Sequence, residues 1–156
     1  MVIRQIRENE IPLLTEFLYE AIFQREGRAS MPRTVIQEPA LFAYIERFGQ
    51  KKDDCCLVAV EQGYIVGAVW VRCRAEGFGF VDENTPELAV SVYAEYRGCG
   101  IGTALVESML IVLRDKGYRQ VSLSVQKDNG ALCIYRKAGF QTVGETEEEY
   151  IMICVL

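Results

Sequence analysis

One segment of the chain, residues 101–116, limits the folds open to it, because the helix that it would form is apolar on almost every side. Drawn at about 3.6 residues per turn, this helix places only Thr103, Glu107 and Arg114 on a narrow polar stripe. Such a helix must pack heavily against other elements, and Gly117 follows it as a cap. Runs rich in β-formers at 88–92 and 121–125 flank it, which predicts a sheet with helices on its faces.

A tight hairpin is the clearest of the other expected elements. The β-rich runs 55–61 and 64–74 are separated by Gln62 and Gly63, a two-residue turn signal for antiparallel strands. The remaining expected elements are a strand at 2–6, a helix at 11–25, a loop at 26–38, a helix using Leu41, Ile45 and Phe48 that ends at Gly49, a helix at 128–138 closed by Gly139, and two strands joined across 145–149. The order βααβββαβαββ predicts one α+β (mixed α/β) domain over residues 1–156.

Composition narrows the chemistry and the setting. The chain has no histidine, which excludes Ser-His-Asp, Cys-His and histidine–metal mechanisms and leaves carboxylates, Tyr, Lys, Cys or water as acid and base. Its six cysteines form no Cys-x-x-Cys pair, so we expect neither a metal site nor a disulfide framework. The formal net charge is −5 without a dense run of Lys and Arg, which argues against a nucleic-acid partner. The longest apolar stretch, 65–71, is too short for a membrane span, and the charges of Arg4 and Arg7 do not fit a secretory signal, so we expect a cytoplasmic protein with no membrane partner.

A glycine-bearing loop lies between the strand 88–92 and the apolar helix. Its sequence is Arg97-Gly98-Cys99-Gly100-Ile101-Gly102. Glycines at a helix start let unpaired backbone N–H groups approach an anion, the helix dipole adds attraction, and Arg97 can add a charged contact. The loop lacks the Lys-Ser/Thr ending of a Walker A motif and the glycine spacing of a dinucleotide-binding fingerprint. It therefore predicts a pyrophosphate site, with a tight strand-to-helix turn as the alternative.

Two motifs and the element order carry a resemblance to a known family. The run from Val90 to Gly102, with Arg97, Gly100 and Gly102 at the spacing Gln/Arg-x-x-Gly-x-Gly/Ala, resembles motif A of the GNAT acetyltransferases. Asn129-Gly130-Ala131, followed by Tyr135 and Gly139-Phe140, is similar to motif B of the same family. The order of elements resembles the family over nearly the whole chain, although Ala94 stands where many members carry Pro.

The resemblance implies a GNAT-like fold and a co-substrate. The fold would be a mostly antiparallel central sheet of about seven strands flanked by four helices. Acetyl-CoA, without a metal, would insert between the strands 88–92 and 121–125, which splay apart in the family. Main-chain groups of Val90, Ser91 and Val92 would bond the pantetheine arm, while the loop Arg97-Gly98-Cys99-Gly100-Ile101-Gly102 would hold the pyrophosphate. Asn129 and Ala131 would support the arm, and Tyr135 would face the thioester sulfur.

Acyl transfer to an amine needs a base, an oxyanion donor and a proton donor for the leaving thiolate. Glu87, just ahead of the strand 88–92, is our first choice for the base because related enzymes often have a glutamate there, with Asp82 or Glu83 as alternatives. A solvated turn carboxylate is the competing interpretation for each of the three. A backbone N–H near Val92 would polarise the thioester carbonyl. Tyr135 is the expected catalytic acid, against the alternative of a core tyrosine.

These features predict an acetyl-CoA-dependent N-acetyltransferase that acts on a primary amine of a small molecule or peptide by direct transfer in a ternary complex. A catalytically silent acyl-CoA-binding or sensor module is the alternative. A covalent route through Cys99 is conceivable from its place at a helix start, but direct transfer does not need it. The final strand, 150–156, is apolar enough to be an edge strand that pairs with another chain, which allows a homodimer.

Overall fold

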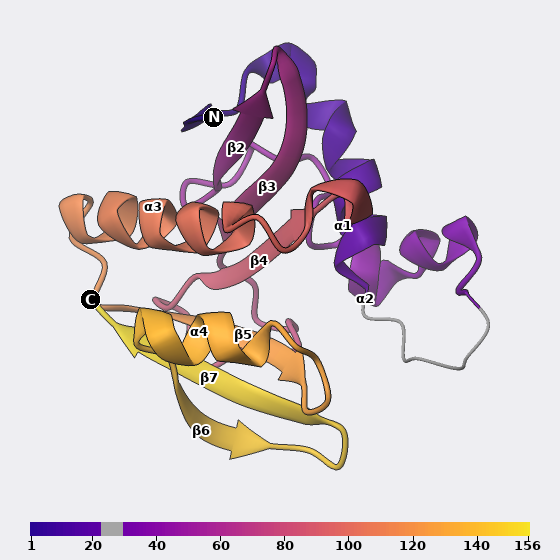
Figure 1. The fold of residues 1–156 in the computed structure, drawn as a ribbon. Helices are drawn as coiled ribbons and strands as arrows, with labels where there is room; N and C mark the ends of the chain where they lie inside the picture. The colour runs from indigo at the N-terminus through magenta and orange to yellow at the C-terminus, as the bar shows by residue number, and fades with distance from the viewer. Residues whose placement is uncertain (23–29) are drawn as a thin grey trace.

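Seven strands form one sheet in the order β1-β2-β3-β4-β5-β7-β6 in the computed structural model, which describes residues 1–22 and 30–156 (Figure 1). The strands are β1 Val2–Gln5, β2 Cys55–Glu61, β3 Tyr64–Arg72, β4 Glu87–Val92, β5 Gln120–Gln126, β6 Gln141–Glu145 and β7 Glu149–Val155. The α-helices are α1 Leu14–Ala21, α2 Pro39–Phe42, α3 Ile101–Asp115 and α4 Leu132–Ala138, and the 3-10 helices are η1 Glu8–Leu13, η2 Arg33–Gln37 and η3 Ala94–Tyr96. Neighbouring strands are antiparallel except β4 and β5, which are parallel. The predicted order βααβββαβαββ and the mixed, mostly antiparallel sheet are confirmed.

The sheet separates two hydrophobic cores, because successive side chains of a strand point to opposite faces. On β3, Val69 and Val71 join the core that contains α3 and α4, whereas Ala68 and Trp70 join the core that contains α1. Figure 1 shows α3 and α4 together on one face of the sheet, with α1 placed apart from them. The face of each strand residue therefore decides which set of helices it meets.

The apolar helix packs as the sequence predicts. Its buried residues are Ile101, Leu105, Val106, Met109, Leu110 and Leu113. Leu105, Met109 and Leu113 have no exposed surface, so truncating one of them to Ala would cost about 2–5 kcal/mol of stability. Gly117 ends the helix with φ +87°, and the N–H of Tyr118 bonds the carbonyl of Leu113 at 3.1 Å. The buried residues run from Ile101 to Leu113, so packing fixes α3 on the sheet along its whole length, including its first turn.

The predicted hairpin between β2 and β3 is confirmed. Gln62 has φ 48° and Gly63 has φ 84°, the two left-handed conformations that a type I′ turn needs. The strands pair from Glu61 and Tyr64 outward, and β3 ends at Arg72, two residues earlier than expected.

The first two predicted helices are shorter than their apolar patterns suggest. The expected helix 11–25 is divided into η1, which contains Pro12, and α1, and residues 23–25 lie outside the described part of the chain. The expected helix through Leu41, Ile45 and Phe48 has only α2 as regular α-helix, followed by turns up to Gly49, which has φ +98°.

Side chains from β3 explain the early end of α2. The carbonyl of Ala43 accepts a hydrogen bond from Arg72 Nη1 at 2.8 Å, and the carbonyl of Tyr44 accepts one from Trp70 Nε1 at 3.2 Å. These two carbonyl groups therefore accept hydrogen bonds from side chains of β3. In a longer helix they would have accepted backbone N–H groups of the next turn.

The expectation that the final strand is an edge strand is wrong. β7 lies between β5 and β6 and pairs with both of them, so its apolar character reflects a central position in the sheet. Met152 and Cys154 are buried there, and β6 forms the outer edge instead. The homodimer predicted from β7 loses its basis.

Among the helices of the described ranges, none has the length and apolar character that crossing a membrane requires.

The parallel neighbours β4 and β5 touch only at one end. Their single paired position is Glu87 with Ser122, next to a hydrogen bond of 3.0 Å from the N–H of Ser122 to the carbonyl of Pro86. Beyond this point β4 continues to Val92 with no pairing to β5. The sheet thus opens between its two halves, as the family resemblance implies.

Candidate active site

The glycine loop is open where it meets α3. Gly98 has φ +78° and Gly100 has φ +84°, and an added Cβ at either position would meet nothing within 4 Å. Residues from Arg97 to Gly100 are exposed. Backbone conformation, rather than crowding by neighbours, therefore requires glycine at these two positions.

Six consecutive backbone N–H groups of the loop and the first turn of α3 have no acceptor in the described ranges. In the described part of the chain, none of the N–H groups from Gly98 to Thr103 donates a hydrogen bond, and the helix ladder starts with Ala104 N–H to Gly100 O at 3.0 Å. Gly100 is the N-cap of α3 and provides no side-chain cap. The partial positive charge at the start of this 15-residue helix adds to the amides. The loop fits a diphosphate, while its binding to one stays a prediction.

The side chain of Arg97 is engaged within the protein. Its Nε donates to the carbonyl of Val92 at 2.9 Å, and its Nη2 donates to Glu20 Oε2 at 3.1 Å. These contacts tie the loop to the end of β4 and to α1. The predicted contact between Arg97 and a phosphate would require the partly exposed ion pair with Glu20 to open, which is a small change for a surface pair.

The predicted pantetheine contacts lie on the unpaired part of β4. Val90 and Val92 pack with the α3 core, and Ser91 faces the other side of the sheet. One edge of these residues pairs with β3, and the edge toward β5 has no strand partner. Ser91 Oγ is buried and has no hydrogen-bond partner in the described ranges. An extended amide-bearing arm could pair with this free edge as a strand would.

The second motif forms a side-chain-stabilised turn before a short helix. Asn129 Oδ1 accepts the N–H of Ala131 at 2.9 Å, and the N–H of Leu132 bonds the carbonyl of Asn129 at 3.1 Å. The local turn delays the start of α4 to Leu132, so the predicted helix 128–138 is too long at its beginning. Asn129 thus shapes the turn before α4 and does not cap the helix, whose N-cap is Ala131 without a side-chain cap, and its contact with a co-substrate stays a prediction.

Tyr135 lies on α4 and belongs to the core that contains α3. Its ring meets the buried ring of Phe140 edge-on, with the two ring centres 5.9 Å apart. No hydrogen bond among the described residues uses its hydroxyl group. Burial raises the pKa of Tyr135 to about 12, so the hydroxyl keeps its proton at neutral pH and can act only as a donor of it. An added Cβ at Gly102 would lie 3.7 Å from Ile134, which places α4 directly beside the start of α3.

The three candidate bases occupy different environments. Asp82 stabilises a turn by accepting hydrogen bonds from Asn84 N–H at 2.9 Å and Thr85 Oγ1 at 2.8 Å, and these bonds lower the pKa of Asp82. Glu83 is exposed. Glu87 is 4% exposed, so the interpretation of a solvated turn carboxylate is wrong for this residue.

Glu87 is enclosed by residues that no sequence motif indicates. Tyr44 donates its hydroxyl proton to Glu87 Oε2, and the Tyr44 oxygen accepts the N–H of Phe78 at 2.9 Å. Oε1 is buried without a hydrogen bond of good geometry in the described ranges, although the nearby N–H of Gly79 favours the charged carboxylate. Desolvation outweighs these contacts and raises the pKa of Glu87. Ser122, which pairs with Glu87 across the strands, has a buried hydroxyl that also finds no partner among the residues the structure describes.

Comparison with known proteins identifies the family. Residues 18–140 match the model of the Acetyltransferase (GNAT) family, and the chain belongs to this family. The chain is 35% identical over 108 residues to mycothiol acetyltransferase of Amycolatopsis mediterranei (strain U-32), covering 67% of this chain and 36% of that protein. It is 30% identical over 111 residues to the ribosomal protein bS18-alanine N-acetyltransferase of Haemophilus influenzae, covering 64% of this chain and 71% of that protein. The chain spans about a third of the length of the mycothiol acetyltransferases that it matches.

Solved structures show the same fold. PaiA N-acetyltransferase from Thermoplasma acidophilum in complex with coenzyme A has a TM-score of 0.73 at 19% identity, with 99% of this chain and 98% of that chain covered. Ribosomal-protein-alanine N-acetyltransferase from Brucella melitensis has a TM-score of 0.68 at 21% identity, with both chains fully covered at 100%. At these identities the likeness concerns the fold alone.

Proposed function

We propose that this chain, as a single domain over residues 1–156, is a cytoplasmic N-acetyltransferase that moves an acetyl group from acetyl-CoA to a primary amine of a small molecule or peptide. Transfer would be direct, in a ternary complex and without a metal. The observation that carries the proposal is the run of six N–H groups from Gly98 to Thr103 that have no partner among residues 1–22 and 30–156, at a helix start next to the opening between β4 and β5. The acetyltransferase relatives are named for acting on a small molecule in one case and on a protein in another, which supports an amine acceptor of either kind.

The residues of the opening divide the work of holding the co-substrate. The amides of the loop Arg97-Gly98-Cys99-Gly100-Ile101-Gly102 would bind the diphosphate. The free edge of Val90-Ser91-Val92 would pair with the pantetheine amides, and Asn129 with Ala131 would support the arm from the start of α4. The bound co-substrate supplies an acyl group activated as a thioester.

Two side chains supply the proton transfers. The acceptor nitrogen forms a bond to the acyl carbon while the carbon–sulfur bond breaks, so one proton must leave the amine and one must reach the thiolate. Glu87 would accept the amine proton, directly or through a water, and Tyr135 would protonate the thiolate. The N–H near Val92 would stabilise charge on the acyl oxygen.

The base faces a task that depends on the acceptor. At neutral pH, deprotonating a lysine costs about 4–5 kcal/mol, whereas an α-amino group costs only about 1 kcal/mol. Burial makes Glu87 a stronger base than an exposed carboxylate, and the chain has no histidine to serve instead. An α-amino group is therefore the easier acceptor for this site.

A domain that binds acyl-CoA without turnover is the second candidate, and one observation favours it. Glu87 lies beneath the loop between β3 and β4, where an added Cβ at Gly77 would fall 1.9 Å from Oε1. An acceptor amine would have to approach the carboxylate past this loop or through a bridging water.

Release of free thiol from acetyl-CoA, measured against a panel of α-amino and lysine-type acceptors, separates the two functions. We expect amine-dependent thiol release together with an acetylated product detected by mass spectrometry. Tight acetyl-CoA binding without turnover on any amine would support the sensor, and absence of binding would contradict both functions.

A further inference from the structure

The hydroxyl group of Tyr44 has a fixed direction in its contact with Glu87. Its oxygen accepts the N–H of Phe78 at 2.9 Å, and its one proton goes to Glu87 Oε2. Burial and the neighbouring carboxylate raise the pKa of Tyr44, so this proton stays in place at physiological pH. Oε2 therefore accepts the Tyr44 proton whenever this contact is formed, and one of its two lone pairs is used in this way.

The second carboxylate oxygen of Glu87, Oε1, is the candidate to take the proton of the acceptor amine. Oε1 of Glu87 is buried beside the loop of Gly77 and Gly79, whose N–H groups form no hydrogen bond of good geometry with it in the described part of the chain. Tyr44 has no second proton to give, and Phe78 N–H already serves the Tyr44 oxygen. We propose that Tyr44 is a positioning residue that holds Oε2 of Glu87 and leaves Oε1 as the oxygen that takes the proton of the acceptor amine, past the Gly77 loop or through a bridging water. This inference rests on the proposed function, because it assigns a task within the same site.

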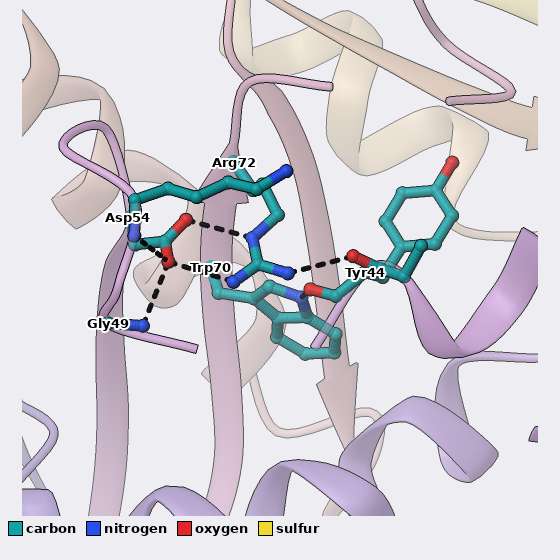
Figure 2. A network of polar contacts seen from close by, with 7 residues as sticks. Tyr44, Gly49, Asp54, Trp70 and Arg72 are labelled. Atoms are coloured by element: carbon teal, nitrogen blue, oxygen red, sulfur yellow. Dashed lines mark hydrogen bonds and ion pairs between the residues drawn. The ribbon is translucent and has the colours of Figure 1, made fainter. Parts of the chain in front are cut away.

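Contacts with β3 hold Tyr44 in this place, as Figure 2 shows. Trp70 Nε1 donates to the carbonyl of Tyr44 at 3.2 Å, and Arg72 Nη1 donates to the carbonyl of Ala43 at 2.8 Å. Arg72 also forms two hydrogen bonds with Asp54, of 2.9 and 2.8 Å, and both side chains are almost fully buried. The segment that carries Tyr44 is thus fastened to the strand next to β4, on which Glu87 lies.

Several charged groups lie around Glu87, but the hydrogen bond from Tyr44 is the main contact that favours the ionised form of Glu87. Arg74 also favours the carboxylate and lies 4.7 Å from the centre of the Tyr44 ring. Glu149, from β7, opposes it. Arg72, which is paired with Glu87 across β3 and β4, has its guanidinium bonded to Asp54. The Tyr44 hydrogen bond is the largest influence that counters desolvation of this carboxylate.

Tyr44→Phe tests the proposal, and the chain offers a matched control. The variant removes the hydroxyl but keeps the ring that stacks on Phe78 at 6.3 Å. Tyr118→Phe likewise removes a hydroxyl that donates to a carboxylate, that of Asp53. Without its donor, Glu87 would be harder to ionise, so the acid limb of the pH–rate profile should move to higher pH in Tyr44→Phe. The loss relative to wild type should be about tenfold greater on the acid limb than on the alkaline plateau. Tyr118→Phe should keep the wild-type profile.

A titration that does not depend on turnover keeps this inference separate from the proposed function. The ¹³C signal of the Glu87 carboxyl group, assigned by its loss in Glu87→Gln, should titrate at higher pH in Tyr44→Phe than in wild type and Tyr118→Phe. Equal midpoints in wild type and Tyr44→Phe would overturn the positioning role. Full turnover by Glu87→Gln would overturn it as well while leaving acetyl transfer intact. If the midpoint is shifted in Tyr44→Phe but the wild-type protein shows no turnover, the positioning of Glu87 by Tyr44 is supported and the proposed enzymatic activity is rejected.

A second variant covers the case in which Tyr44→Phe does not fold. Gly77→Ala would bring a methyl group against Oε1 without changing the Tyr44 side chain itself. The displaced carboxyl group should then titrate at a different pH from wild type, and an unchanged midpoint would overturn the assignment of Oε1.

Discussion

Replacing Gly100 with Leu should weaken binding of acetyl-CoA much more than an equivalent change elsewhere. Gly100 and Gly63 form an unusually close pair for this comparison, because both have φ +84° and an added Cβ at either would meet nothing within 4 Å. Gly63 lies in the hairpin between β2 and β3, and Gly100 is the N-cap of α3. Each Leu variant should lose about 1–2 kcal/mol of stability, the cost of a left-handed conformation for a residue with a side chain.

Only the Gly100 variant should lose affinity. Its side chain would enter the space beside the N–H groups from Gly98 to Thr103. In the described residues these N–H groups donate to no protein acceptor. Loss of one hydrogen bond to a charged phosphate oxygen corresponds to about 1.5–3 kcal/mol, or a Kd that rises about tenfold to a hundredfold.

Isothermal titration calorimetry with acetyl-CoA, and urea unfolding of both variants, would give these two quantities. Matched stability losses with a large difference in Kd are the expected result. If both variants bound acetyl-CoA within about twofold of each other, the loop would be only a strand-to-helix turn, and the reasoning about its amides would be refuted.

Three further changes probe other parts of the site. Tyr135→Phe should lower turnover about a hundredfold or more without changing the Kd for acetyl-CoA, whereas Tyr64→Phe, at a 73% exposed position, should leave steady-state kinetics unchanged. Arg72→Leu would leave a fully buried carboxylate without its ion-pair partner and should cost about 3–5 kcal/mol in urea unfolding, while Arg33→Leu, in an exposed pair, should change the midpoint little. Burial raises the pKa of Glu87, so its contribution to stability is present at low pH and is lost as pH rises through that pKa. Glu87→Gln should therefore be more stable than wild type at neutral pH, with the gain disappearing at pH about 4, and a gain that is independent of pH would contradict the assignment.

The sequence pattern was sufficient to predict turns and helix ends, because these depend on residues that are adjacent in the chain. Gln62 and Gly63 specify their hairpin because few residues accept a left-handed conformation at both turn positions. Gly117 and Gly139 end α3 and α4 for the same reason, with φ +87° and φ +108°. The unpaired amides of the glycine loop also follow from local order, since a helix start always leaves its first N–H groups without partners in the helix.

The lengths of several elements depended on distant contacts that a pattern cannot contain. α2 stops at Phe42 where the next two carbonyl groups bind side chains of β3, which lie 29 and 26 residues further along the chain. The apolar composition of the final strand does not itself say which strands lie beside it, and only its pairing with β5 and β6 places it inside the sheet. In both cases the deciding partner is far away in sequence.

The amino-acid sequence by itself determined the order of elements, the open loop at the start of α3 and the family to which the chain belongs, because each depends on residues that are neighbours along the chain. Tertiary structure alone decided that Glu87 is buried, that Tyr44 binds one of its oxygens and that β7 lies within the sheet. A carboxylate acquires its basicity from its whole surroundings, and those surroundings exist only once β3, β4, β5 and the segment after α2 have packed together.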